Sequence, residues 1–202
     1  MSRKETLLDA AIALFAEKGY NGTSTSEIVE KAGVAQGTLF YHFKNKEGML
    51  LTILENILNE YLREMEEVAS VTQSGLMTVE NLIRCSTHFR QTRSLELLVL
   101  MRDFPADLIK PDSAQMVFIV EFFERFHDLF KSSIDRGQND GSIRKVSSEK
   151  YTHILLGMLA GLDRHILLGP LPTPELTEEI VSFCCSALSP SGIDPVSHER
   201  RP

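Results

Sequence analysis

The sequence predicts an all-α fold, and two features of the chain carry this prediction. Apolar residues recur at i, i+3, i+4 and i+7 through most of the chain, which is the spacing of one face of an amphipathic helix. The alternation of apolar and polar residues that is typical of strands is almost missing. Glycine and proline interrupt the periodic segments where helices would end. We therefore expect a set of helices joined by short connections.

The N-terminal segment is expected to form three short helices and the start of a longer one. The expected helices cover about residues 4–18, 25–32, 35–42 and the segment that follows Asn45. Ser24 and Glu27 have the spacing of a capping box, in which each side chain bonds a backbone amide at the start of the second helix. Asn45 is a favourable N-cap for the fourth helix.

The remainder of the chain is expected to be a helical body. Further helices are expected at about 78–93, 94–104, 112–136, 147–168 and 174–188. The segment from Gly137 to Gly141 is typical of a loop, and the tail from Ser189 has the proline, serine and charge content of a disordered end. The predicted domains are therefore residues 1–48, residues 49–188 and a tail at 189–202.

Charge is distributed unevenly along the chain. The net charge is −7, yet residues 1–50 contain as many basic as acidic residues, so the excess of acid lies in the rest of the chain. An acidic body repels a polyanion and leaves the neutral N-terminal end to approach it. The charge pattern thus favours a nucleic-acid partner at the N-terminal end.

Cysteine usage and hydropathy indicate a cytoplasmic protein. Cys85, Cys184 and Cys185 lack the spacing of a disulfide framework, which is typical of a reduced compartment. The first residues lack the apolar run of a signal peptide, and the most apolar segment, 151–168, is interrupted by charges. We find no phosphate-binding glycine loop, nucleophile elbow or zinc-hydrolase motif, so an enzyme is not expected, nor a cofactor or a metal ligand set.

The strongest feature is a pair of short helices joined by the segment Ala32-Gly33-Val34-Ala35. Gly33 tolerates a positive φ, so the chain can turn sharply there. The apolar residues with the spacing to pack this pair against the first helix are Ile28, Val29, Ala32, Val34 and Leu39. The residues left on the outward face are Gln36, Gly37, Thr38, Tyr41 and His42. A short exposed helix that starts with small and amide-bearing residues fits the major groove of DNA.

This segment resembles the TetR (tetracycline-repressor-like) family of bacterial regulators. The resemblance is carried by AAIALFAEKGYNGTSTSEIVEKAGVAQGTLFYHFKNKEGML, whose short motifs from AlaAla to LysGlu follow the family's order and spacing. It covers residues 7–50, about a quarter of the chain, and the body matches only in its helical plan. The resemblance implies an N-terminal helix-turn-helix DNA-binding domain of three helices and a C-terminal helical domain for ligand binding and dimerisation.

The resemblance also implies which residues contact DNA. The implied set is Thr25, Ser26, Gln36, Gly37, Thr38, Tyr41, His42 and Lys46. The amide of Gln36 can pair with adenine N6 and N7, whereas Lys46 would add a charge-assisted phosphate contact at a helix N-terminus. Tyr41 and His42 would reach phosphates from the end of the recognition helix.

Two positions depart from the family pattern. The family usually has tyrosine where this chain has Phe40, so one phosphate-bonding hydroxyl is lost, and Tyr41 can compensate for it. Gly48 replaces a usual helix former, at a cost of about 0.8–1 kcal/mol relative to alanine in a helix interior. On this basis we expect the substitution Gly48→Ala to raise stability, and we consider a hinge role for Gly48.

The C-terminal helices carry the pattern of a dimer interface. Gly157 and Gly161 lie one turn apart, and small residues at this spacing let two helices approach closely; family likeness supports a four-helix bundle across a two-fold axis. Packing within one chain is the alternative. The predicted interface residues are Gly157, Ala160, Gly161, Arg164, Ile180 and Cys184.

The segment 112–136 is apolar on nearly all sides, so it must pack on more than one neighbour. In the family the matching helix lines a ligand cavity, which implies a pocket for a hydrophobic or aromatic molecule. The candidate apolar wall is Phe89, Met101, Phe104, Phe122, Phe126 and Met158, and the candidate polar anchors are Arg84, His88, His127 and His153. A plain aromatic core is the alternative.

The sequence therefore predicts a homodimeric repressor that binds a palindromic operator and is released by a small inducer. An inducer that fits only a wider spacing of the two recognition helices would lower DNA affinity. Three alternatives remain: a thiol or metal sensor that uses the three cysteines with His165, an activator or adaptor on the same fold, and a small-molecule enzyme.

Overall fold

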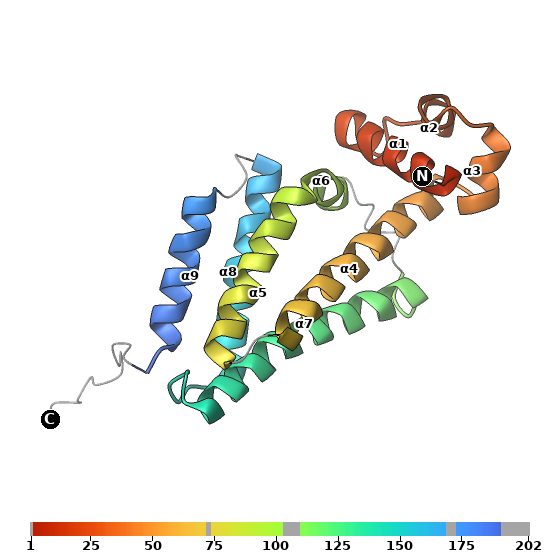
Figure 1. Cartoon of the computed structure of the whole chain (residues 1–202). Coiled ribbons are helices and arrows are strands. Elements are labelled where there is room, and N and C mark those ends of the chain that lie inside the picture. The colour runs from red at the N-terminus through yellow and green to blue at the C-terminus, as the bar shows by residue number, and fades with distance from the viewer. Residues whose placement is uncertain (1, 72–73, 103–109, 169–172, 191–202) are drawn as a thin grey trace, which may run out of the picture. The chain divides into compact units, whose positions relative to one another are not determined.

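The computed structural model describes residues 2–71, 74–102, 110–168 and 173–190, with the backbone alone for 164–167. Within these ranges the chain forms nine helices and no strand, so the predicted all-α fold is confirmed (Figure 1). The helices are α1 (Arg3–Lys18), α2 (Thr25–Ala32), α3 (Gln36–Phe43), α4 (Lys46–Val71), α5 (Gly75–Thr92), α6 (Ser94–Arg102), α7 (Ala114–Asp140), α8 (Ser148–Leu168) and α9 (Pro174–Leu188). Among the described helices, none combines the length and apolarity needed to cross a membrane.

The chain forms two compact units. Unit 1 contains residues 1–63, 89–124 and 163–171, and unit 2 contains residues 64–88, 125–162 and 172–202. Helices α4, α5, α7 and α8 each contribute residues to both units. The predicted domains were continuous stretches of sequence divided at residues 48 and 188, whereas these units are defined by contacts. The predicted boundaries therefore stay predictions.

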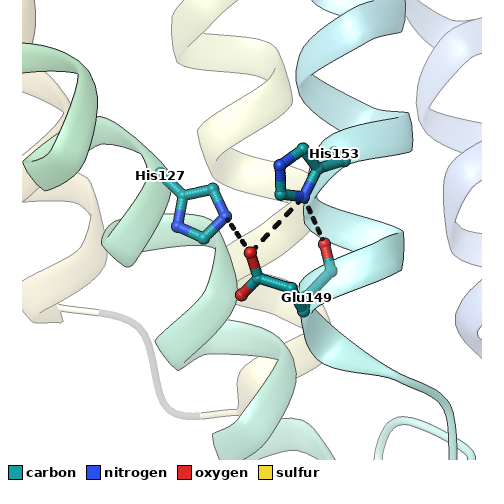
Figure 2. Close-up of side chains that lie close together, drawn as sticks. All are labelled: His127, Glu149 and His153. Carbon is teal, nitrogen blue, oxygen red and sulfur yellow. Dashed lines mark hydrogen bonds and ion pairs between the residues drawn. The ribbon is translucent and has the colours of Figure 1, made fainter.

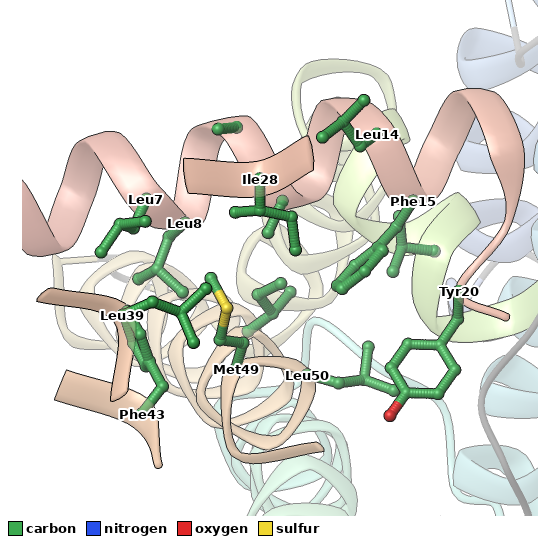
Figure 3. Packing of buried hydrophobic residues seen from close by; sticks show 14 of the residues in the cluster. Leu7, Leu8, Leu14, Phe15, Tyr20, Ile28, Leu39, Phe43, Met49 and Leu50 are labelled. Atoms are coloured by element: carbon green, nitrogen blue, oxygen red, sulfur yellow. The ribbon is translucent and has the colours of Figure 1, made fainter. Parts of the chain in front are cut away.

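The N-terminal helices of unit 1 enclose a hydrophobic core. Its buried members are Leu7, Leu8, Ala10, Ala11, Leu14, Phe15, Tyr20, Ile28, Val29, Leu39, Phe43, Met49, Leu50, Ile53 and Val99 (Figure 3). Residues from α1, α2, α3, the start of α4 and α6 thus share one core. Arg102 adds a polar contact, because its guanidinium donates to the carbonyls of Phe15 (2.7 Å) and Ala16 (3.0 Å) in the last turn of α1.

The predicted caps of α2 and α4 are present. The amide of Glu27 donates to Ser24 Oγ (3.2 Å) and the amide of Ser24 donates to Glu27 Oε2 (2.8 Å), which completes the capping box of α2. Asn45 Oδ1 accepts from the amide of Gly48 (2.7 Å) at the start of α4. These bonds satisfy amides that a helix start leaves unpaired.

The predicted loop from Gly137 to Gly141 is wrong, because α7 continues to Asp140 and only Gly141, at φ 79°, breaks it. Gly137 serves close packing instead: a Cβ on Gly75 would lie 2.1 Å from the amide nitrogen of Gly137. Asp140 then holds the neighbouring helix start, since its carboxylate accepts from the amides of Gly75 (2.8 Å) and Ser142 (2.8 Å). The two glycines let α5 and α7 of unit 2 touch backbone to backbone.

The expectation that alanine at position 48 would stabilise the protein is also overturned. A Cβ on Gly48 would lie 2.1 Å from the backbone oxygen of Phe43, a distance that real Cβ atoms do not adopt. The carbonyl belongs to the end of α3, so the clash can be relieved only by moving α3 relative to α4. Gly48 is therefore required by this close approach.

We predict that Gly48→Ala lowers the free energy of unfolding by about 1–3 kcal/mol, the usual cost of overpacking. Urea unfolding followed by circular dichroism measures this change. Gly37→Ala is the matched control: a Cβ there has nothing within 4 Å, so the helix propensity of alanine should stabilise by about 0.5–1 kcal/mol. A Gly48→Ala protein as stable as the wild type would contradict the steric argument.

Candidate functional site

The α2–α3 pair has the geometry of a helix-turn-helix. Gly33 ends α2 in the left-handed conformation (φ 66°, ψ 33°), and α3 begins three residues later. Leu39 and Phe43 of α3 and Ile28 of α2 are buried in the core of unit 1. One side of α3 is thereby fixed inward, and the opposite side is presented to solvent.

The outward side of α3 carries most of the residues that the sequence predicts for base and phosphate contact. Tyr41 is 84% exposed, His42 and Gly37 are exposed, and the rings of Tyr41 and His42 lie 5.0 Å apart in an edge-to-face arrangement. Phe40 is 48% exposed on the same helix. From the sequence, this position was notable only for the hydroxyl that phenylalanine lacks. An exposed phenylalanine at this position offers an apolar contact, such as one with a thymine methyl group.

Gln36 and Thr25 lie together at the N-terminal ends of α3 and α2. Gln36 Nε2 donates to Thr25 Oγ1 (3.1 Å), and both side chains are partly buried. Ser26 is exposed at the start of α2 and Thr38 is partly buried. The bond to Thr25 orients the Gln36 amide and still leaves its oxygen and its second N–H for a base edge.

Lys46 occupies a different environment from the one predicted. Its ammonium donates to the carbonyls of Tyr20 (2.8 Å) and Thr23 (2.9 Å) and lies 4.3 Å from the centre of the Tyr20 ring. Lys46 thus fastens the α1–α2 connection to α4. A phosphate contact would have to use its third N–H, so its predicted DNA role stays a prediction.

An ion pair fixes the charge at the start of α2. Lys18 Nζ lies 2.7 Å from Glu27 Oε1, and this hydrogen bond, with those from the amide and hydroxyl of Ser24, lowers the pKa of Glu27 to about 2. Because the pKa of Glu27 in the folded protein lies below its ordinary value of 4.5, the ionised carboxylate stabilises the fold. This stabilisation is complete above pH 4.5 and is lost as the pH falls towards 2. At neutral pH Glu27 is fully ionised.

Two candidate pocket residues of unit 1, Phe89 and Phe122, belong to an aromatic cluster. Tyr61 is stacked on Phe89 with ring centres 4.5 Å apart, and Phe122 lies 6.3 Å from Tyr61. Arg90, which the sequence argument missed, is buried beside them: it donates to Asp163 Oδ1 (2.6 Å) and to the Tyr61 hydroxyl (2.9 Å). The available signal was the charge of Asp163, which interrupts the apolar segment 151–168.

The candidates in unit 2 are dispersed. Phe126 packs edge-to-face on Phe130, with ring centres 5.6 Å apart. Arg84 forms ion pairs with Glu80 and Glu178. His88 is exposed in a hollow of about 330 Å³ that is also lined by Arg84. His127 and His153 lie together on α7 and α8, their ring centres 5.2 Å apart. The remaining candidates are Met158, which is half-buried, Met101 of unit 1, which is exposed, and Phe104, which lies outside the described residues.

The predicted dimer residues separate by exposure. Gly157, Ala160 and Gly161 are exposed on α8, with nothing within 4 Å of a Cβ at either glycine. Ile180 and Cys184 are buried within unit 2 instead, so they face the chain's own core. The side chain of Arg164 lies outside the described residues. Two large apolar side chains that the prediction left out are exposed, Ile154 (58%) on α8 and Phe183 (66%) on α9.

The thiols sit in surroundings that keep them protonated. Burial raises the pKa of Cys184 to about 12, and burial together with nearby Glu64 and Glu67 raises that of Cys85 to about 11. Burial likewise raises the pKa of Cys185. Because the thiolate is the reactive and metal-binding form, these environments argue against the cysteine-sensor alternative.

Comparison with known proteins identifies the N-terminal segment. Residues 7–53 match the family of bacterial regulatory proteins of the tetR type. The chain is 28% identical over 142 residues to the HTH-type transcriptional repressor KstR2 of Rhodococcus jostii (strain RHA1), which is 70% of this chain and 68% of that relative.

Two solved structures share the fold over nearly the whole chain. The ketosteroid transcriptional regulator KstR2 of Mycobacterium tuberculosis superimposes with a TM-score of 0.74 at 18% identity, covering 93% of this chain and 95% of that one. FadR of Bacillus subtilis, solved in complex with stearoyl-CoA, gives 0.71 at 19% identity, covering 91% and 98%. With the helix-turn-helix geometry of α2 and α3, the match over residues 7–53 identifies the N-terminal segment as the domain shared by the tetR family of bacterial regulatory proteins.

Proposed function

We propose that this regulator is a repressor that binds a palindromic operator as a homodimer and releases it when a small hydrophobic ligand binds. The observation that carries the DNA-binding part is the outward face of α3, where Gly37, Tyr41 and His42 are exposed while Leu39 and Phe43 are buried. Packing alone does not account for so exposed a tyrosine. The relatives named as repressors support the sign of regulation.

The palindromic operator follows from two-fold symmetry. Two copies of α3 must enter major grooves about 34–36 Å apart to read two half-sites. The exposed residues of α8 and α9 support such a dimer, because Gly157 and Gly161 leave the backbone of α8 open to close approach and Ile154 and Phe183 expose apolar area. In the proposed interface these exposed residues contact the partner, whereas Ile180 and Cys184 are buried within their own chain.

The ligand class rests on two supports. KstR2 of Mycobacterium tuberculosis is described as a ketosteroid regulator, and FadR of Bacillus subtilis binds stearoyl-CoA. In this chain, Tyr61, Phe89 and Phe122 bring three aromatic rings together in unit 1. We propose a ligand with a large apolar part, of the steroid or fatty-acyl kind.

We predict that Gln36→Ala reduces the preference for the operator over a duplex with altered bases by about 1–3 kcal/mol, or 5–150-fold. The lost bidentate contact to a base edge is the physical reason. Fluorescence anisotropy with DNA from upstream of the gene, at several salt concentrations, measures it. Tyr41→Phe is the comparison, because loss of one phosphate donor should weaken all duplexes alike. Wild-type protein that ignores every duplex at low ionic strength would overturn the proposal.

We predict that Phe183→Glu raises the dimer dissociation constant at least about tenfold, because it places a charge in an apolar contact. Analytical ultracentrifugation measures the change. Ser182→Glu adds the same charge at an exposed neighbour and should leave the assembly intact. Equal behaviour of the two variants would place the interface elsewhere.

We predict that stearoyl-CoA or a ketosteroid lowers operator affinity by about 5–150-fold, the usual range of allosteric coupling. Phe122→Ala should reduce this ratio, because Phe122 is buried in the aromatic cluster, whereas Phe123→Ala, which changes a side chain that is 60% exposed, should not. For each variant, the ratio compares operator affinity without ligand and operator affinity with ligand. If neither compound changes operator binding, the proposed ligand class is wrong.

A further inference from the structure

We propose that His127, Glu149 and His153 form a binding site for a divalent transition-metal ion, with zinc preferred. His127 lies on α7, Glu149 lies in the first turn of α8, and His153 follows one turn later (Figure 2). One ligand atom from each residue lies within 4.8 Å of the other two. All three residues belong to unit 2.

The separations match those of a coordination sphere. Glu149 Oε1 lies 3.4 Å from His127 Nε2 and 3.6 Å from His153 Nδ1. Zinc binds imidazole nitrogen and carboxylate oxygen at about 2.0–2.2 Å, which puts neighbouring tetrahedral ligands about 3.3–3.5 Å apart. Both measured distances are too long for a strong charge-assisted hydrogen bond and close to this ligand separation. An ion between the three groups therefore requires only small side-chain movements.

The state of His127 supports the same conclusion. Its Nε2 atom is buried and has no hydrogen-bond partner among the described residues. A buried polar atom without a partner is costly, and a metal ion would use its lone pair. Asp128 Oδ1 lies 3.6 Å from the other ring nitrogen, where a carboxylate can orient a metal-binding imidazole.

His153 is the adaptable ligand. Its Nδ1 lies 2.8 Å from the backbone oxygen of Glu149, and its side chain is 67% exposed. Coordination replaces this hydrogen bond, and the exposed ring has room to turn. The ion would join α7 to the first two turns of α8, so its binding should stabilise unit 2.

The ligand set indicates the kind of metal. Two imidazoles and one carboxylate suit zinc, cobalt or nickel, whereas magnesium and calcium prefer oxygen ligands throughout. Three protein ligands leave a fourth position for water. The proposal assigns His127 and His153 a role other than the inducer contact predicted for them, and it does not depend on the operator or on the inducer.

The experiment uses the full chain, with any purification tag removed and metal stripped by EDTA. Calorimetric titration with zinc chloride should show one ion per chain, and zinc at about 100 times its Kd should raise Tm by about 5–10 °C. Magnesium chloride at the same concentration should do neither. His127→Gln and His153→Gln should each weaken zinc binding at least about tenfold and abolish the Tm shift.

Matched controls separate this site from other zinc-binding groups. His88→Gln changes an exposed histidine of the same unit, and Cys184→Ser/Cys185→Ser removes the adjacent thiols; both proteins should bind zinc as the wild type does. Circular dichroism of each metal-free variant confirms that it is folded. The proposal is overturned if wild-type protein takes up no zinc, if both histidine variants bind it normally, or if only the cysteine variant loses it.

Discussion

The burial of Leu39 and Phe43 is the constraint on which the DNA-binding end depends. These two residues lie one turn apart on α3, so burying both fixes the rotation of the helix about its axis. That rotation places Gly37 and Tyr41 on the opposite, exposed side of the helix. The reading face is thus specified by the hydrophobic core behind it, and a change in the core would turn the contacts away from the groove.

The same core connects the start of α4 to helices α1, α2 and α3. Met49 and Leu50 of α4 are fully buried in it, and Lys46, one helical turn earlier, bonds the carbonyls of Tyr20 and Thr23. The close approach of Gly48 to Phe43 O adds a contact that side chains cannot loosen. This junction is therefore stiff, which argues against Gly48 as a hinge and for α4 moving together with the helices that it supports.

Local features of this chain were predictable from sequence because their causes are local. The capping box of Ser24 and Glu27 and the turn at Gly33 depend on residues within a few positions, and the structure has both. Gly137 was misjudged because its role depends on Gly75, which lies far away in sequence. The predicted pocket residues have the same limitation, because their surroundings depend on residues that are distant in sequence. Periodicity identifies apolar positions, but it does not show that Phe89 stacks on Tyr61 or that Arg90 pairs with Asp163.

Buried polar groups in this protein differ in whether their own chain satisfies them. Arg90 has both a carboxylate and a hydroxyl within hydrogen-bond distance, so its burial is explained as part of the fold. The thiol of Cys184 is buried and kept neutral, which costs little and requires no partner. His127 differs from both, since its buried Nε2 faces a carboxylate at a distance that suits neither a good hydrogen bond nor separate solvation. An ion shared with Glu149 and His153 would satisfy this nitrogen, whereas no hydrogen bond within the described residues does.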